Sequence, residues 1–336
     1  MKANIHQISE LTGFSPATIS KALNGKKGIR EETVKIIREA ADQLGYRTET
    51  KISKIYLVIL EHSKKTAPST TFHHFVLDGV EKQAQEAELE TVLVLLDKQS
   101  PSFLDKISEL TNDLSAAIVL VGTGLVKEDY DLFLSCKNRI IVMDGWSKFH
   151  PFASVLIDNE DLAETAVNYL LEKGHRKIGY LRSQRRLNNF SEREDGYYKA
   201  LRKAGLPINP AFIIDVGVGM EATCSHVRQA LSKASDLPTA FLAENDYIAI
   251  GASRGIQQAG FRIPEDISLI GIDDIEYAKM ETPPLTTFQV HMQDIGRLAV
   301  QELLKESNKA LPKIKIQVCA DLIERQSVKN LSERKD

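Results

Sequence analysis

Residues 5–24 read IHQISELTGFSPATISKALN, and they have the pattern of two short helices with a tight turn between them. The first apolar residues recur at the spacing of one helical face, at Ile5, Ile8 and Leu11. Gly13 can adopt the positive φ that ends a helix. Ser15-Pro16 then has the form of an N-cap followed by proline at the first helical position, so a second helix is expected to begin there.

The second helix has two different faces. Ile19 and Leu23 lie one turn apart on one face, and the other face is small and polar, with Ala17, Thr18, Ser20 and Lys21. A third helix, ended by Gly45, is indicated by apolar residues spaced three, four and three apart: Val34, Ile37, Ala41 and Leu44. Three such helices predict a helix-turn-helix head whose second helix can enter the DNA major groove. Spacing alone is equally compatible with a helical hairpin that binds no DNA.

Charge and composition narrow the class of protein. Residues 1–51 hold nine Lys and Arg against six Asp and Glu, a formal charge of +3 in a chain of net charge −3, which favours phosphate contact at this end only. The chain has no apolar run long enough for a membrane span or a signal peptide, so we expect a cytoplasmic protein without membrane contact. The three cysteines lack metal-ligand spacing, and we expect free thiols, no metal and no cofactor.

The remainder of the chain alternates short β-branched runs with amphipathic stretches. The expected strands are 55–60, 91–96, 117–121, 140–143, 178–181, 212–216, 240–243 and 268–272, and the clearest helices are 75–88, 162–173 and 195–204. Such alternation predicts parallel sheets covered on both faces. About ten strands exceed one ordinary sheet, so two lobes are expected.

Polar side chains follow the expected strands at their carboxyl ends. Ligands of parallel sheets bind beyond these ends. In chain order they are Glu61, His62, Asp97, Asp144, Asp158, Asn159, Arg182, Ser183, Asn245, Asp246, Asp273 and Asp274. Carboxylates and amides hold hydroxyl groups by direct hydrogen bonds, so this set suits a sugar.

Several segments resemble the LacI/GalR family, the family of the lactose and galactose repressors. In the head these are residues 5–24 and 40–47, the latter reading AADQLGYR. In the body they read DNE at 158–160, KGHRKIGYL at 173–181, EREDGY at 192–197, AEND at 243–246, ISLIGIDD at 267–274 and PPLTT at 283–287. The resemblance extends from about residue 3 to about residue 327.

The resemblance implies a domain organisation and a function. A helix-turn-helix head at 1–47 and a short linker at 48–54 would precede a two-lobed α/β body at 55–327, similar to a periplasmic sugar-binding protein, and a flexible tail at 328–336. The chain would be a transcription regulator and not an enzyme, a homodimeric repressor of a carbohydrate-utilisation operon. It would bind palindromic double-stranded DNA and a sugar or sugar phosphate held between the lobes.

The family also implies which side chains touch DNA. The positions of Pro16, Ala17 and Lys21 face base edges, and the other implied contacts are Ile5, Ser15, Thr18, Ser20, Asn24 and Tyr46. Lys21 stands where arginine is usual, so a single point charge replaces a guanidinium fork that can bind guanine with two hydrogen bonds.

In the body, the resemblance implies that Arg193 and Asp273 bind sugar hydroxyls and that Asn245 and Asp144 contribute to this binding. Phe72 and His73 would supply a flat face. From the residues alone, Arg193 fits a solvated charge cluster better than a ligand site, and Asp273 and Asn245 could cap turns or helices. The loop at 217–220 lacks the aromatic residue that stacks on the sugar in many relatives, so the identity of the sugar stays open.

The sequence fits two other classes of protein less well. Gly122-Thr123-Gly124 follows a strand as a dinucleotide loop would, but the third glycine of that fingerprint is missing. An exported sugar carrier would need a signal peptide.

The linker departs from the family because Thr48 replaces the usual proline. Ile52 is the one apolar residue of the linker before the first strand, so we expect no strong central DNA kink. The C-terminal tail has no heptad pattern, which favours a dimer over a tetramer.

Overall fold

The computed structural model describes the chain except residues 1–3, 24–27, 45–51, 62–69, 306–313 and 333–336, and it leaves the side chains at 42 and 70–74 undescribed. The chain divides into two compact units, Met1–Ser53 and Lys54–Asp336. We call them the head and the body and describe each by itself.

The head is a bundle of three helices: α1 (Ile5–Thr12), α2 (Pro16–Leu23) and α3 (Glu31–Gln43). Its core is formed by the buried residues Ile8, Ile19, Ala22, Ile37, Ala40 and Ala41. Gly13 ends α1 with a φ of +73°, as the turn requires, and its N–H donates to the carbonyl of Ser9 at 2.8 Å. Leu11 was expected to face this core, but its side chain is 52% exposed.

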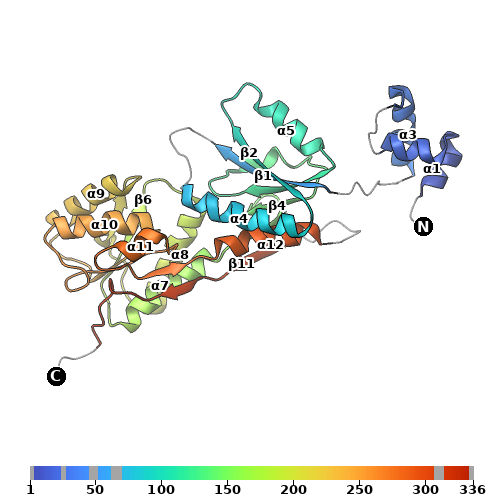
Figure 1. The fold of residues 1–336 in the computed structure, drawn as a ribbon. Coiled ribbons are helices and arrows are strands. Elements are labelled where there is room, and N and C mark those ends of the chain that lie inside the picture. Colours follow the sequence, from blue (N-terminus) through green and yellow to red (C-terminus); the bar gives the residue numbers. More distant parts are fainter. Residues whose placement is uncertain (1–3, 24–27, 45–51, 62–69, 306–313, 333–336) are drawn as a thin grey trace. The chain divides into compact units, whose positions relative to one another are not determined.

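The first lobe of the body is built on a six-stranded parallel sheet in the order β11-β5-β4-β3-β1-β2. The strands are β1 (Lys54–Glu61), β2 (Glu90–Asp97), β3 (Ala116–Val121), β4 (Ile140–Met143), β5 (Ala153–Ile157) and β11 (Lys315–Val318). Helices α5 (Phe103–Asn112) and α6 (Lys127–Asp131) pack on one face, while α4 (Thr70–Glu86) and α12 (Met292–Leu304) contact the sheet as a pair (Figure 1). The predicted strand positions in this lobe are confirmed, and β5 and β11 are additional.

Strand β2 differs from the expectation of strands buried on both faces. It forms one edge of the sheet, and Leu93 and Leu95 on it are 45% and 52% exposed. Residues two apart in a strand point to the same side, so these leucines form one exposed apolar stripe.

Helices α4 and α12 approach each other through two glycines. A Cβ built on Gly79 would lie 2.1 Å from the carbonyl oxygen of Gln293, and one built on Gly296 would lie 2.7 Å from that of Val76. Neither position therefore has room for a side chain, and the two backbones pack directly against each other.

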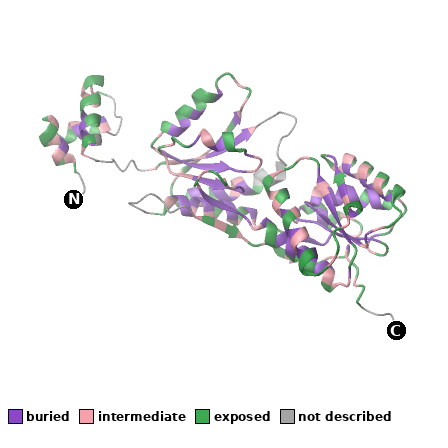
Figure 2. Ribbon diagram, turned by 180° about the vertical axis from the view of Figure 1, so that it is seen from behind, coloured by how far each residue is buried: buried purple, intermediate pink, exposed green. Residues whose placement is uncertain are grey.

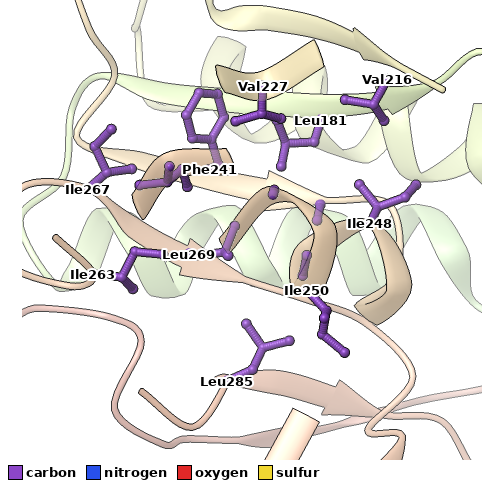
Figure 3. Packing of buried hydrophobic residues seen from close by; sticks show 14 of the residues in the cluster. Leu181, Val216, Val227, Phe241, Ile248, Ile250, Ile263, Ile267, Leu269 and Leu285 are labelled. Atoms are coloured by element: carbon purple, nitrogen blue, oxygen red, sulfur yellow. The ribbon is translucent and has the colours of Figure 1, made fainter. Parts of the chain in front are cut away.

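The second lobe has a four-stranded parallel sheet in the order β7-β6-β8-β9. Its strands are β6 (Ile178–Ser183), β7 (Ile213–Val216), β8 (Ala240–Ala243) and β9 (Ser268–Ile270). Its helices are α7 (Asn159–Glu172), α8 (Asn188–Lys203), the short 3-10 helix η2 (Pro210–Phe212), α9 (Met220–Lys233), α10 (Asp246–Gln258) and α11 (Glu276–Met280). Leu181, Phe241 and Leu269 from three neighbouring strands meet side chains of α9 and α10 in one apolar core (Figure 3).

Three crossings of the chain join the lobes. The first follows β5, the second lies between β10 (Thr287–Gln289) and α12, and the third lies between β11 and β12 (Asp321–Ile323). Strands β10 and β12 pair antiparallel, so the second and third crossings run side by side. Buried residues gather on the strands of both lobes (Figure 2), and the predicted architecture of two parallel-sheet lobes is confirmed.

The C-terminal residues 328–332 are not a free tail. The N–H of Leu331 donates to the carbonyl of Lys173 at 2.7 Å, and that of Lys329 donates to Ser268 Oγ at 3.0 Å. Buried His175 contacts the Lys329 carbonyl at 3.1 Å and Thr239 Oγ1 at 2.9 Å, which agrees with the structural role expected for this histidine. Within the described ranges, every helix is too short or too polar to span a membrane.

Candidate functional site

The N-terminus of α2 carries a hydroxyl cap. Ser15 Oγ accepts from the Thr18 N–H at 3.2 Å and lies 2.9 Å from Thr18 Oγ1. The cap fixes the start of the helix in the way that the Ser15-Pro16 pair predicts.

Three residues of the predicted base-reading set, Pro16, Ala17 and Lys21, are exposed on α2. Ser20 is half-buried on the same helix. Ile5 differs from this set because it packs against the core of the head. Asn24 and Tyr46, also predicted to contact DNA, lie outside the described residues.

The body contains a cavity lined by residues from both lobes. From the first lobe come Gly122, Thr123, Gly124, Asp144, Gly145, Trp146 and Leu156, and from the second Asn159, Asn188, Asn189 and Glu192. Its volume is about 260 Å³, which includes space open to solvent. Most of the lining segments come directly after strands β3, β4 and β5. They therefore lie at the carboxyl ends of the strands, where parallel sheets bind ligands.

Two glycines shape the wall of the cavity in the first lobe. A Cβ on Gly145 would lie 2.7 Å from the Cα of Gly122, so the loops after β3 and β4 touch through their backbones. The segment from Gly122 to Gly124, weighed above as a fragment of a dinucleotide loop, therefore forms part of this wall.

Asp144 directly follows β4 and is 4% exposed. Its Oδ2 accepts a hydrogen bond from Thr123, while its buried Oδ1 has no partner among the described residues. Burial raises the pKa of Asp144 to about 7, against the lowering effects of the Thr123 hydrogen bond and the Arg193 charge. Its backbone φ of +53°, uncommon for a residue with a side chain, is consistent with a constrained site.

Arg193 lies on α8 and is 2% exposed, so it does not belong to a solvated cluster. Its Nε donates to Asn159 Oδ1 at 2.9 Å, and its Nη1 donates to the carbonyl of Glu244. Its Nη2 lies 3.7 Å from Asp273 Oδ1, which brings these two predicted sugar ligands together. Burial raises the pKa of Asp273 to about 6, although the positive charge of Arg193 opposes this.

The predictions did not include a polar group that joins the lobes. Trp146 Nε1 donates to Glu192 Oε1 at 2.7 Å, and Glu192 Oε2 accepts from Asn159 Nδ2 at 3.2 Å. Trp146 could have been found from sequence, because it is the single tryptophan and stands two residues after Asp144. Glu192 carries no such signal, since it is one of four consecutive charged residues.

The other predicted sugar ligands are less clearly placed. The side chain of Asn245 caps α10 by accepting from the Ile248 N–H at 2.9 Å, which is the capping alternative raised above. Phe72 and His73 lie in α4, and their side chains are outside the described part of the structure.

Two further carboxylates, Glu244 and Asp246, are buried in the second lobe. Glu244 accepts from Arg186 Nη1 at 2.6 Å and from the Ser183 N–H at 2.7 Å, and its burial raises its pKa to about 7. Asp246 accepts from Thr287 Oγ1 at 2.6 Å, and burial raises its pKa well above the usual range. These carboxylates bind protein groups, which gives them a structural role.

Comparison with known proteins agrees with this division of the chain. Residues 4–49 match the family described as bacterial regulatory proteins, lacI family, and residues 167–328 match the periplasmic binding protein-like domain. The chain is 30% identical over 312 residues to the HTH-type transcriptional repressor PurR of Aliivibrio salmonicida, covering 90% of this chain and 92% of that protein. It is 28% identical over 310 residues to the ribose operon repressor of Haemophilus influenzae, covering 90% and 91%.

Solved structures share the fold. A transcriptional regulator CelR in complex with cellobiose superposes with a TM-score of 0.70 at 21% identity, covering 97% of this chain and all of that one. A lac repressor dimer bound to operator and the anti-inducer ONPF gives 0.70 at 22% identity, with 98% and 100% coverage.

Proposed function

The chain belongs to the lacI family of bacterial regulatory proteins, and we propose that it represses a carbohydrate-utilisation operon under the control of a sugar bound between its lobes. As a member of this family it is a DNA-binding transcription regulator and not an enzyme. It acts in the cytoplasm, where its DNA target is. The observation that carries the sugar site is the cavity between the lobes, which is lined by Asp144, a residue with a buried oxygen that has no partner among the described residues.

In this proposal, the head reads DNA through the exposed residues of α2. Lys21 and Ala17 contact base edges, and the short head cannot by itself supply enough contacts for a specific site. A homodimer on a palindromic operator doubles these contacts. The exposed Leu93 and Leu95 on edge strand β2, together with Phe75 on α4, favour such pairing because they give the body an apolar surface for a second copy.

The sugar is held from both sides of the cavity. Asp144, which lines the cavity, accepts from a hydroxyl on the side of the first lobe. Arg193, which donates to the lining residue Asn159, binds further hydroxyls from the second lobe together with Asp273. We assign Asn245, Phe72 and His73 supporting roles at the margin of this site.

Binding is coupled to DNA through the lobes. The sugar contacts lining residues of both lobes, so its binding depends on the separation of the lobes. A ligand with different affinities for two lobe arrangements shifts their populations, and with them the spacing of the two heads in the dimer.

The test is a thermal-shift screen of sugars and, because PurR proteins are among the relatives, of purine bases. A sugar should stabilise the wild type, and Arg193→Ala should lose most of that shift. Lys199→Ala removes a half-buried cation from the same helix that pairs with Glu160 and Glu164; it is the matched control and should keep the shift. Stabilisation by a purine and not by any sugar, or equal stabilisation of wild type and Arg193→Ala, would contradict the proposal.

The DNA-binding part of the proposal is tested separately. Retention on an operator-sequence or heparin column should be lost when residues 1–50 are removed, while the body remains folded by circular dichroism. A headless body that is still retained would contradict the assignment of DNA binding to the head.

A further inference from the structure

The charges around the cavity define the class of ligand more narrowly than a sugar or sugar phosphate. We propose that the cavity accepts an uncharged polyhydroxyl ligand and excludes the phosphate ester of the same sugar. This inference rests on the proposed sugar-controlled function and adds the charge of the effector to it.

The ionisable residues that line the cavity, among those described, are Asp144 and Glu192, and both are acids. Glu192 already accepts from Trp146 and Asn159. A phosphate group placed here would meet two carboxylates inside a partly closed space, where solvent screens charges poorly.

The unsatisfied oxygen of Asp144 points to the same conclusion. Asp144 Oδ1 is buried and has no partner in the described part of the chain, so a hydrogen-bond donor from a ligand would satisfy it. A sugar hydroxyl can donate. A fully ionised phosphate group offers only acceptor oxygens, so it cannot take the place of a hydroxyl next to Oδ1.

The charges of the cations near the cavity are already engaged by neighbouring groups, although Arg193 can still donate to an uncharged hydroxyl. Arg193 donates to Asn159 and to the Glu244 carbonyl, and its remaining nitrogen lies 3.7 Å from Asp273. The amines of Lys148 and Lys315 lie 5.5 and 4.1 Å from the ring centre of Trp146, and neither lysine lines the cavity.

One feature would favour an anion, and it is weaker. Helix α8 begins at the cavity with Asn188, and its N-cap residue Leu187 provides no side-chain acceptor for the first N–H groups. A helix N-terminus carries about half a positive elementary charge. Glu192, one turn into the same helix, offsets it with a full negative charge, and Asp144 adds a second when ionised. Hydroxyl oxygens can also accept from these N–H groups.

The experiment uses the full-length protein and matched pairs of compounds: ribose with ribose 5-phosphate, glucose with glucose 6-phosphate, and cellobiose with its 6-phosphate. Binding is measured at pH 8 by the fluorescence of Trp146, the single tryptophan, and by calorimetry. The parent sugar that binds should do so at least tenfold more tightly than its ester.

Two variants assign the cause. Asp144→Asn combined with Glu192→Gln removes both charges, and the preference for the parent sugar should shrink at least threefold. Glu160→Gln removes an exposed carboxylate next to Asn159 but outside the cavity, and it should keep the full preference. If the double variant does not fold by circular dichroism, Glu192→Gln alone serves, with the same direction expected.

The outcomes separate the two proposals. An ester that binds as tightly as its parent sugar, or a preference that the neutral variant retains in full, overturns the charge selection and leaves sugar control intact. A panel in which no sugar and no ester binds contradicts sugar control itself, and this inference with it.

Discussion

Trp146 and Glu192 form a hydrogen bond between the two lobes, with the indole Nε1 donating to Oε1 at 2.7 Å. Trp146 follows β4 in the first lobe, and Glu192 lies on α8 in the second. Both residues are half-buried. The bond therefore connects the two lobes through one pair of side chains, and both side chains also line the cavity.

A double-mutant cycle with Trp146→Phe and Glu192→Ala should measure the coupling free energy of this hydrogen bond. Because a hydrogen bond to a charged acceptor contributes about 1.5 to 3 kcal/mol, we expect a coupling of that order in the free energy of unfolding. Urea denaturation followed by far-ultraviolet circular dichroism provides the values, since Trp146 itself is changed. Additive effects of the two substitutions would mean that the pair contributes nothing to stability.

Asp144→Asn should change how stability depends on pH. The pKa of Asp144 is about 7 in the folded protein, above the value of about 3.9 for an unfolded chain, so the folded state binds more protons between these limits. Its contribution to stability is therefore present at pH 4 and is lost as the pH rises to 7 and beyond. Relative to wild type, the variant should gain stability between pH 5 and pH 8, by at most about 4 kcal/mol.

Thermal unfolding of both proteins across this pH range provides the measurement. Glu160→Gln, at an exposed carboxylate, is the control and should track the wild type. A difference between Asp144→Asn and wild type that is constant with pH would show that Asp144 titrates normally.

Gly79→Ala should destabilise the body although alanine favours helices. The new Cβ would lie 2.1 Å from the carbonyl oxygen of Gln293, so α4 and α12 must move apart, at a cost of about 1 to 3 kcal/mol. In a helix without this neighbour the same change would stabilise by about 0.5 to 1 kcal/mol, so the sign of the effect is diagnostic. Glu81→Ala, at an exposed position of α4, should change the free energy of unfolding by less than about 0.5 kcal/mol.

Lys21→Ala should relax the sequence specificity of DNA binding. If its ammonium group reads a base, the loss on the cognate operator should be about 1 to 3 kcal/mol, with little change on non-specific DNA. Fluorescence anisotropy at fixed salt on both DNAs measures the two losses. Equal losses on both would make Lys21 a phosphate contact.

The short linker should leave the operator nearly straight at its centre. Thr48 replaces the proline usual in the family, and Ile52, half-buried just before β1, is the one apolar residue available as a wedge. Gel-phasing of bent DNA should therefore show little bend at the dyad, and Ile52→Ala should not change it. A strong central bend that this substitution abolishes would reverse the prediction.

Much of the fold could be predicted because its signals are local. The Ser15-Pro16 pair and Gly13 mark helix ends by their own backbone preferences, and the apolar runs of β4 and β8 match the predicted ranges residue for residue. Strands β10, β11 and β12 were missed because they are short, contain polar residues and depend on pairing partners distant in sequence.

The candidate sugar site was predicted only in part, because some of its residues have local signals and others depend on packing. The position of Asp144 after β4 follows from strand order, whereas the distance between Arg193 and Asp273 depends on how α8 and the loop after β9 pack. Asn245 shows the limit of the method, since a residue at the end of a strand is equally well placed to cap the following helix. No spacing rule could have connected Glu192 to Trp146, because they belong to different lobes.

The strand order also has a consequence for synthesis on the ribosome. Strand β11 completes the first sheet by pairing with β5, yet it is made after every strand of the second lobe's sheet. The second sheet can thus form while the first still lacks β11 and the buried face of α12, which leaves the edge of β5 unpaired. An unpaired strand edge beside an apolar surface invites aggregation, so the nascent chain, between the emergence of β5 and that of β11, is the stage at which this protein most needs a chaperone.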